Sequence, residues 1–307
     1  MTECERIIEQ GFLPLSFFDE ETRCDYKVTH EMKKVWAIYM ELYSVLKELC
    51  DKHGLLLFTD GGTTLGAIRH KGFIPWDDDM DVCLLRKDYD ILKSLSNELP
   101  PPFFLQNAAT DSEFGFSFMR ICNSNTAYSV RPFTHALFNK GISIDIFPLD
   151  KVTEDDYIPR RERIAELIKK NSAYMRRNLP NKNEHDIEYL RNYLDTSSTP
   201  LDIWNEIEKI ATMDEDKDTP YISLLVSTQY APEKKIWPKH IFSDGISKPF
   251  ENKEVVVPIG YDEQLKIYFG DYMKFPPVKE RGKWHSAQFY PDIPYKDYYM
   301  KEFGLYK

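Results

Sequence analysis

Four aspartates fall within five residues of one short segment and run directly into an apolar stretch at residues 80–85: Asp77, Asp78, Asp79 and Asp81. Carboxylates at the mouth of a buried strand repel one another and lose hydration, so they need a compensating cation. Residues two apart on a strand point to the same face. We therefore expect Asp79 and Asp81 to share a face and Asp78 to point away from it.

A third acid lies in another apolar segment with strand-like alternation, residues 142–147, where Asp145 stands between Ile144 and Ile146. Carboxylate oxygens with an open coordination sphere suit Mg²⁺ or Mn²⁺, which then bind phosphate oxygens of a substrate. We predict that Asp79, Asp81 and Asp145 are both the metal ligands and the catalytic residues. The ordinary alternative for an aspartate in an apolar strand is an ion pair with arginine or lysine.

A glycine turn precedes the acids. Gly61, Gly62 and Thr63 lie between a short apolar segment and a helical stretch. Free backbone N–H groups at such a turn, together with a helix N-terminus, favour a phosphate group. We predict that these three residues bind the substrate.

Cations near these motifs are further candidates for substrate binding. Arg69 and Lys71 lie between the glycine turn and the acids, so they can face a diphosphate. Arg281 and His285 belong to a basic cluster in the tail that also includes Lys279 and Lys283. The alternative for each is a solvated surface position. Aromatic residues that could line a binding site by cation–π contact are Trp76, Trp284, Tyr272 and Tyr295.

The elements that must position these residues alternate between helix and strand. Periodicity predicts helices at 30–53, 88–99 and 260–269, a short helical stretch from about 65 to 70, and two or three more helices within 153–215. Strands are predicted at 55–58, 80–85, 142–147, 221–227 and 254–257, with two or three in 103–129. Residues 1–28 and the tail from Gly270 are predicted to be irregular. The pattern favours an α+β fold, with a mixed sheet, flanking helices and a helical and C-terminal elaboration.

Composition narrows the function classes. The chain has 307 residues and a net charge of −10, which disfavours general binding of nucleic acid or anionic membranes. Its five cysteines include no C-x-x-C pair, which argues against a disulfide framework and a structural zinc site. Neither a secretory signal nor an apolar run of about 20 residues is visible. We expect a cytoplasmic protein with at most peripheral contact with the inner face of the membrane.

Residues 61–81 resemble the LicD family of the nucleotidyltransferase superfamily. The family signature reads Gly-Gly-Thr-x-Leu-Gly-x-x-Arg-His-x-Gly-x-Ile-Pro-Trp-Asp-x-Asp-x-Asp, and this segment matches every specified position. The resemblance continues through 141–150 and the tail segments 257–261, 269–273 and 276–277. It implies a nucleotidyltransferase-like catalytic core at 30–150. Residues 1–29 precede this core, and an elaboration at 151–307 packs on the same cleft.

The resemblance also implies an activity. Similar bacterial proteins transfer phosphocholine from CDP-choline to sugars of teichoic acid, capsule or lipooligosaccharide, and animal relatives of the fukutin group transfer ribitol phosphate. We therefore expect a metal-dependent phosphotransferase whose partners are a CDP-alcohol and a glycan or lipid-linked glycan acceptor. The zinc loop of fukutin-related proteins has no counterpart here.

Two other functions share the same acids. A nucleotidylyltransferase would transfer NMP and release pyrophosphate, and a non-catalytic binder would keep only the fold. The sequence leaves open the donor headgroup, the acceptor, the number of metal ions, the general base and the oligomeric state.

Overall fold

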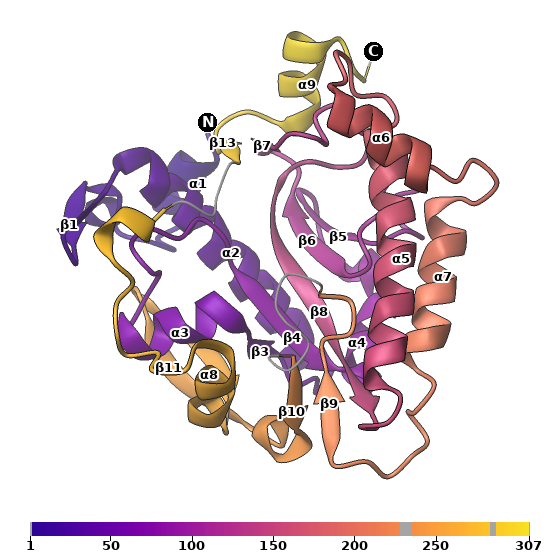
Figure 1. Ribbon diagram of the computed structural model, residues 1–307. Coiled ribbons are helices and arrows are strands. Elements are labelled where there is room, and N and C mark those ends of the chain that lie inside the picture. Colours follow the sequence, from indigo (N-terminus) through magenta and orange to yellow (C-terminus); the bar gives the residue numbers. More distant parts are fainter. Residues whose placement is uncertain (1, 228–234, 283–286, 307) are drawn as a thin grey trace.

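The fold is described by a computed structural model that covers residues 2–227, 235–282 and 287–306. A long helix, α2 (His30–Lys52), lies across a seven-stranded sheet (Figure 1). The strands are β3 (Phe58–Thr59), β4 (Asp81–Leu85), β5 (Phe103–Gln106), β6 (Met119–Asn123), β8 (Ile142–Val152), β9 (Tyr221–Ser223) and β10 (Ile236–Pro238).

Strand β8 organises the sheet. It runs parallel to β4 on one edge, and on the other it pairs in turn with antiparallel β6 and β9. Its alternation is regular: Ile142, Ile144 and Ile146 are buried in the core shared with α2, whereas Ser143 and Asp145 are half-buried. The apolar positions therefore fix which face of β8 meets α2 and leave Asp145 facing the other way.

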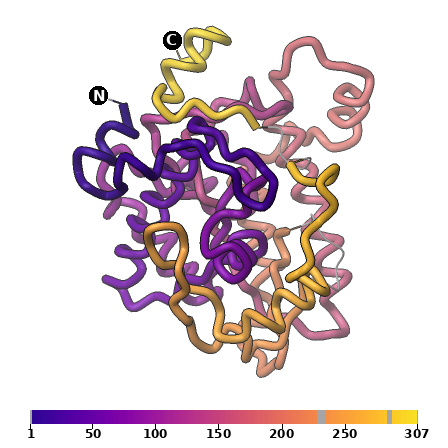
Figure 2. Tube along the Cα trace, turned by 90° about the vertical axis from the view of Figure 1, so that its left-hand side faces the viewer, coloured from indigo at the N-terminus to yellow at the C-terminus, as the bar shows by residue number. Residues whose placement is uncertain are grey.

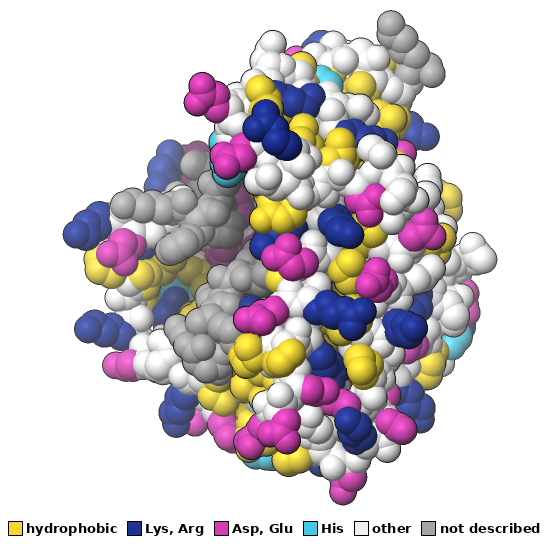
Figure 3. Space-filling model, turned by 45° about the vertical axis from the view of Figure 1, so that its right-hand side comes forward, with side chains coloured by type: hydrophobic (Ala, Val, Ile, Leu, Met, Phe, Trp, Pro, Cys, Tyr) yellow, Lys and Arg dark blue, Asp and Glu magenta, His cyan; other side chains and the backbone are white. Residues whose placement is uncertain are grey.

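Two groups of elements flank the sheet (Figure 1). One comprises α5 (Tyr157–Arg176), α6 (Glu184–Tyr193) and α7 (Pro200–Ala211). The other comprises α3 (Gly61–Arg69), α8 (Tyr261–Phe269) and the hairpin of β11 (Gly245–Phe250) with β12 (Lys253–Pro258). On the outer face of the first group, basic and acidic side chains are intermingled (Figure 3). That face presents neither charge as a continuous field.

The mixed sheet flanked by helices confirms the α+β prediction. The three helices in 153–215 are also confirmed, with capping boxes at Asn183 and Thr199 that begin α6 and α7. Other elements have different bounds from those predicted. The strand expected at 55–58 is Phe58–Thr59, and the helix expected at 88–99 is α4 (Arg86–Ser94). The division at residue 150 stays a prediction, and the sheet takes strands from both sides of it.

The first 28 residues are not irregular, so that prediction was wrong. Thr2 and Glu5 form a capping box that begins α1 (Glu3–Glu9). Cys24 and Asp25 take positive φ angles of 51° and 59°, which close a hairpin between β1 (Glu21–Arg23) and β2 (Tyr26–Val28). The hairpin depends on a two-residue turn, and its three-residue strands are too short to show an apolar pattern in the sequence.

The tail is not irregular either. Strand β13 (Gln288–Tyr290) pairs with β7 (Ala127–Ser129), and α9 (Tyr295–Phe303) follows it. The returning segment passes the N-terminal part of the chain (Figure 2), where Lys34 of α2 and Asp292 form an ion pair at 3.0 Å. Short 3-10 helices complete the described elements: η1 (Leu15–Phe18), η2 (Ser96–Glu98), η4 (Lys239–Phe242) and η5 (Val278–Glu280).

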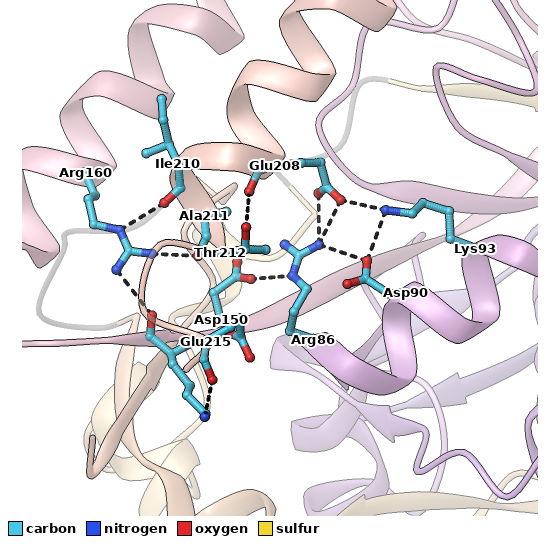
Figure 4. Close-up of polar contacts among 11 residues, drawn as sticks. Arg86, Asp90, Lys93, Asp150, Arg160, Glu208, Ile210, Ala211, Thr212 and Glu215 are labelled. Atoms are coloured by element: carbon cyan, nitrogen blue, oxygen red, sulfur yellow. Dashed lines mark hydrogen bonds and ion pairs between the residues drawn. The ribbon is translucent and has the colours of Figure 1, made fainter. Parts of the chain in front are cut away.

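A buried ion-pair network fastens α4, β8 and α7 together (Figure 4). Arg86 donates from Nε to Asp150 at 2.6 Å and from Nη1 to Glu208 at 2.9 Å, and Lys93 also reaches Glu208 at 2.8 Å. The network lies toward the end of β8, away from Asp145. Among the described residues, no helix combines the length and apolar character that crossing a membrane requires.

Candidate active site

A cavity of about 230 Å³ lies where β4 begins, beside the first half of β8. Its wall brings together acids from both strands, an arginine from β6 and three aromatic rings. These lining residues are Asp78, Asp79, Asp81, Asp145, Arg120, Tyr39, Tyr128 and Phe289. The three aspartates that the sequence singled out as metal ligands therefore line one cavity.

Strand register produces this convergence. Asp81 pairs with Asp145 across parallel β4 and β8, and Arg120 pairs with Asp145 across antiparallel β6 and β8. Asp60, just after β3, donates its backbone N–H to the carbonyl of Asp81 at 3.0 Å. Side chains at paired positions share a face of a sheet. Three carboxylates and one guanidinium thus form a row across four neighbouring strands.

Asp145 has a cationic partner. Arg120 donates from Nε to Asp145 Oδ1 at 2.6 Å and from Nη2 to Oδ2 at 3.3 Å, and its Nη1 donates to the Tyr128 hydroxyl at 2.7 Å. Burial is the largest single influence and lowers the pKa of Arg120, but Asp145, Tyr128 and Cys122 together outweigh burial and raise that pKa. The ion pair that was the alternative for Asp145 is present, and it lies within the cavity wall.

Asp81 lies in an electrostatically unfavourable environment for a charged carboxylate. Burial, followed by repulsion from Asp145 and Asp60, raises the pKa of Asp81 well above its usual range. Its backbone N–H donates to Thr63 Oγ1 at 2.9 Å, which fixes the start of β4 against α3. A bound cation would offset this repulsion.

The expected separation of Asp78 from Asp79 depended on strand geometry that does not reach them, and it stays a prediction. Strand β4 begins at Asp81, so strand alternation does not extend to the two preceding acids, and both line the cavity. Asp78 is largely buried, and its carbonyl accepts a hydrogen bond from the Tyr39 hydroxyl at 2.9 Å. Asp79 is exposed.

Asp60 was missed by the sequence analysis. Its buried carboxylate accepts hydrogen bonds from Gln264 Nε2 and the Tyr268 hydroxyl, both at 2.8 Å, and Lys235 Nζ donates to that hydroxyl at 2.7 Å. Burial raises the pKa of Asp60, although Lys235 and these donors oppose the rise. Its position directly between an apolar strand and Gly61 is the signal that could have revealed it.

The glycine turn has a clear structural basis. Gly61 takes a φ of +49°, which favours glycine. A Cβ on Gly62 would lie 2.8 Å from Asp77 Oδ2, so glycine allows this carboxylate to approach α3. Thr63 contacts Asp81 as described above. The motif therefore positions the acids, and its role in binding phosphate stays a prediction.

The predicted cations that lie within the described residues do not line the acid cavity. Arg69 and Arg281 lie together instead: both guanidinium carbons are within 5.7 Å of the Phe275 ring, and Arg281 also stacks on Trp76 at 4.6 Å. Lys71 is exposed. His285, with Lys283 and Trp284, lies outside the described residues. Their substrate-binding roles stay predictions.

The other aromatic candidates also lie elsewhere. Tyr272 donates to Asp262 at 2.7 Å, and Tyr295 lines a second cavity between α9 and the loops around β5. The aromatic rings of the acid cavity come from Tyr39, Tyr128 and Phe289. Of the tail aromatics, Phe289 reaches the acids because β13 pairs with β7.

The acids suit a metal that binds together with its substrate. Within the described part of the chain, no three side chains among His, Cys, Asp and Glu form a ready-made metal cluster. Mg²⁺ commonly uses only one or two carboxylates, with water and substrate phosphates as the remaining ligands. Asp81 and Asp145, as paired neighbours in one cavity, fit that requirement. Metal binding stays a prediction.

Comparison with known proteins bears directly on this site. Residues 54–167 match the family model described as LicD/FKTN/FKRP, nucleotidyltransferase domain. The chain carries a LicD-family domain. The matched residues include Asp60, Asp81, Arg120 and Asp145, so the charged row lies within the LicD-family domain.

Individual relatives extend the likeness beyond that domain. The chain is 28% identical over 268 residues to the lipopolysaccharide cholinephosphotransferase LicD of Haemophilus influenzae. The aligned region covers 84% of this chain and 97% of the relative. An uncharacterized protein of Rickettsia prowazekii is 32% identical over 82 residues, or 27% of this chain and 29% of the relative.

Proposed function

We propose that this chain is a cholinephosphotransferase that moves phosphocholine from CDP-choline to a hydroxyl of a cell-surface glycan. The observation that carries the proposal is the pairing of Asp81 with Asp145 in a cavity of a LicD-family domain. The name of the Haemophilus influenzae relative supports phosphocholine as the group and a lipopolysaccharide-like glycan as the acceptor. Teichoic acid and capsule are related acceptors.

The reaction is an in-line substitution at phosphorus. An oxygen of the acceptor forms a new bond to the phosphorus of phosphocholine, the bond from that phosphorus to the CMP oxygen breaks, and CMP leaves. A carboxylate of the cavity takes the acceptor proton. Mg²⁺ or Mn²⁺ held by Asp81 and Asp145 would supply positive charge to the phosphate oxygens and the leaving group.

The cavity wall suits a trimethylammonium headgroup. Choline carries a permanent positive charge and no N–H donor, so aromatic faces and carboxylates select it better than a hydrogen-bond network does. Tyr39, Tyr128 and Phe289 line the cavity beside Asp78 and Asp79. This combination supports CDP-choline over CDP-ribitol or CDP-glycerol, whose hydroxyl groups require hydrogen-bonding partners.

A donor panel tests the proposal. The purified protein is incubated with Mg²⁺, an acceptor glycan and CDP-choline, CDP-ethanolamine, CDP-ribitol or CDP-glycerol, and release of CMP is measured. We expect the highest kcat/KM with CDP-choline and no activity in EDTA until Mg²⁺ or Mn²⁺ is returned. Preference for CDP-ribitol or CDP-glycerol would refute the choline assignment, and full activity after exhaustive chelation would refute metal dependence.

The same assay separates the alternative nucleotidylyltransferase. That enzyme would release pyrophosphate from a nucleoside triphosphate and sugar or alcohol phosphate, whereas the proposed reaction releases CMP and no pyrophosphate. We further propose that the protein acts at the cytoplasmic face of the membrane, where CDP-activated donors meet lipid-linked glycan acceptors.

A further inference from the structure

Arg120 has hydrogen-bonding capacity that the protein does not use. Three of its N–H groups donate to Asp145 and Tyr128, and a guanidinium carries five. The other two, one on each Nη atom, have no acceptor among the described residues. The side chain is only 10% exposed, and it lines the cavity that holds the acids. Its remaining donors are therefore available to a ligand in that cavity.

Aromatic rings hold the guanidinium in place. Its central carbon lies 4.0 Å from the Phe116 ring centroid, 5.5 Å from that of Phe118 and 5.9 Å from that of Tyr128. Stacking of this kind favours arginine because the planar group is weakly hydrated. A rigid fork with free donors is preorganised for an anion with paired oxygens, such as a phosphate.

A second ion pair to the same strand gives a comparison, although Arg86 too has a buried Nη2 with no hydrogen-bond partner among the described residues. Arg86 contacts Asp150 of β8 with the same 2.6 Å distance from Nε to Oδ1 that joins Arg120 to Asp145. Arg86 also pairs with Glu208, and Asp150 has no exposed surface. Among the described residues, Arg120 instead pairs with one acid, whose side chain is 24% exposed, and Arg120 lines a cavity.

We propose that Arg120 binds the diphosphate of the donor and shares Asp145 with the metal ion. This inference rests on the proposed function, because it takes Asp145 as a metal ligand. Without ligands, Arg120 is the counter-ion of Asp145. A divalent ion on Asp145 repels the guanidinium, and a phosphate oxygen replaces the lost negative charge. Metal and donor therefore bind cooperatively, with Arg120 as the coupling residue.

The test measures Mn²⁺ binding by electron paramagnetic resonance and CDP-choline binding by calorimetry, each with and without the other ligand. Arg120→Gln keeps a hydrogen-bond donor beside Asp145 and removes the charge. We expect it to bind Mn²⁺ about tenfold more tightly than the unaltered protein, because a cation next to the site is gone. CDP-choline binding should weaken about tenfold, and the cooperativity between the two ligands should disappear.

Arg86→Gln is the matched control. It removes an arginine at the same distance from an aspartate of the same strand, so it should lower the thermal unfolding temperature and leave Mn²⁺ affinity unchanged. Arg120→Lys keeps the charge but cannot fork between Asp145 and a phosphate. It should therefore bind Mn²⁺ normally and CDP-choline more weakly. This variant tests the role of Arg120 if Arg120→Gln does not fold.

The outcomes separate two kinds of failure. If the unaltered protein binds Mn²⁺ but Arg120→Gln binds it no more tightly, or if Arg120→Lys binds CDP-choline normally, Arg120 is structural and the inference is wrong. If the unaltered protein does not bind Mn²⁺, or if Asp81→Asn binds it as tightly as the unaltered protein does, the metal site itself is wrong, and the proposed function fails with it.

Discussion

Asp81→Asn should stabilise the metal-free protein while it abolishes activity. Adjacent strands lie roughly 4.8 Å apart, so the Asp81 and Asp145 carboxylates are close neighbours. At about 5 Å and an effective dielectric constant of about 20, two like charges repel by about 3 kcal/mol. Because Arg120 already neutralises much of the charge on Asp145, we expect removal of Asp81 to raise the free energy of unfolding by about 1–2 kcal/mol.

The effect on transfer has the opposite sign. Loss of a metal-binding carboxylate should cost several kcal/mol of transition-state stabilisation, on the order of a thousandfold in kcat/KM. Both effects are measured on one preparation, by thermal unfolding in EDTA and by CMP release in Mg²⁺. For a chain of this size, the stabilisation should raise the unfolding temperature by about 2–3 °C.

Added Mg²⁺ should reverse the order of stability, because it stabilises only a protein that binds it. Asp216→Asn is the control, since it removes one exposed carboxylate far along the chain from the cavity acids and should change neither quantity. An Asp81→Asn protein that is less stable than the unaltered protein in EDTA would show that the carboxylates do not repel as the strand register requires.

Three further substitutions probe the residues around the acids. Tyr268→Phe removes a donor to buried Asp60, so we expect a loss of about 1–3 kcal/mol in urea unfolding; an unchanged midpoint would contradict this. Phe289→Ala removes an aromatic wall of the cavity and should raise KM for CDP-choline about tenfold while CTP binding stays unchanged. Burial lowers the pKa of Lys140 to about 7, so between pH 7 and its unfolded value of about 10.5 the unfolded chain binds the extra proton. The free energy of unfolding should therefore rise with pH across that window, and Lys140→Met should remove the rise.

Long, strongly patterned elements were predictable from the sequence. Helix α2 follows the apolar spacing of its residues, and β8 follows the alternation around Asp145. Short elements were not: the β1–β2 hairpin and β13 have three residues in each strand, too few to show a period. Their formation depends on turn conformation and on partners distant in the chain, which local pattern does not encode.

The acids of the candidate site were predictable, but their neighbours were not. Asp81 and Asp145 could be identified because each is a carboxylate in an apolar strand. Arg120 lies in β6 beside Met119 and Ile121, and only the register with β8 shows that it meets Asp145. Asp60 likewise accepts a hydrogen bond from Gln264, which lies 204 residues later in the chain, and the sequence does not reveal this contact. Residues that act through pairing across the sheet cannot be identified until the sheet order is known.

The pairing of β13 with β7 has a consequence for synthesis of the protein. Among the described residues that line the acid cavity, Ala287 and Phe289 leave the ribosome last, long after Asp81, Arg120 and Asp145. A nascent chain can therefore form the charged row while one wall of the cavity is still missing. Until β13 arrives, these two residues are missing from the cavity lining, so a chain terminated before β13 would leave the acids more open to water.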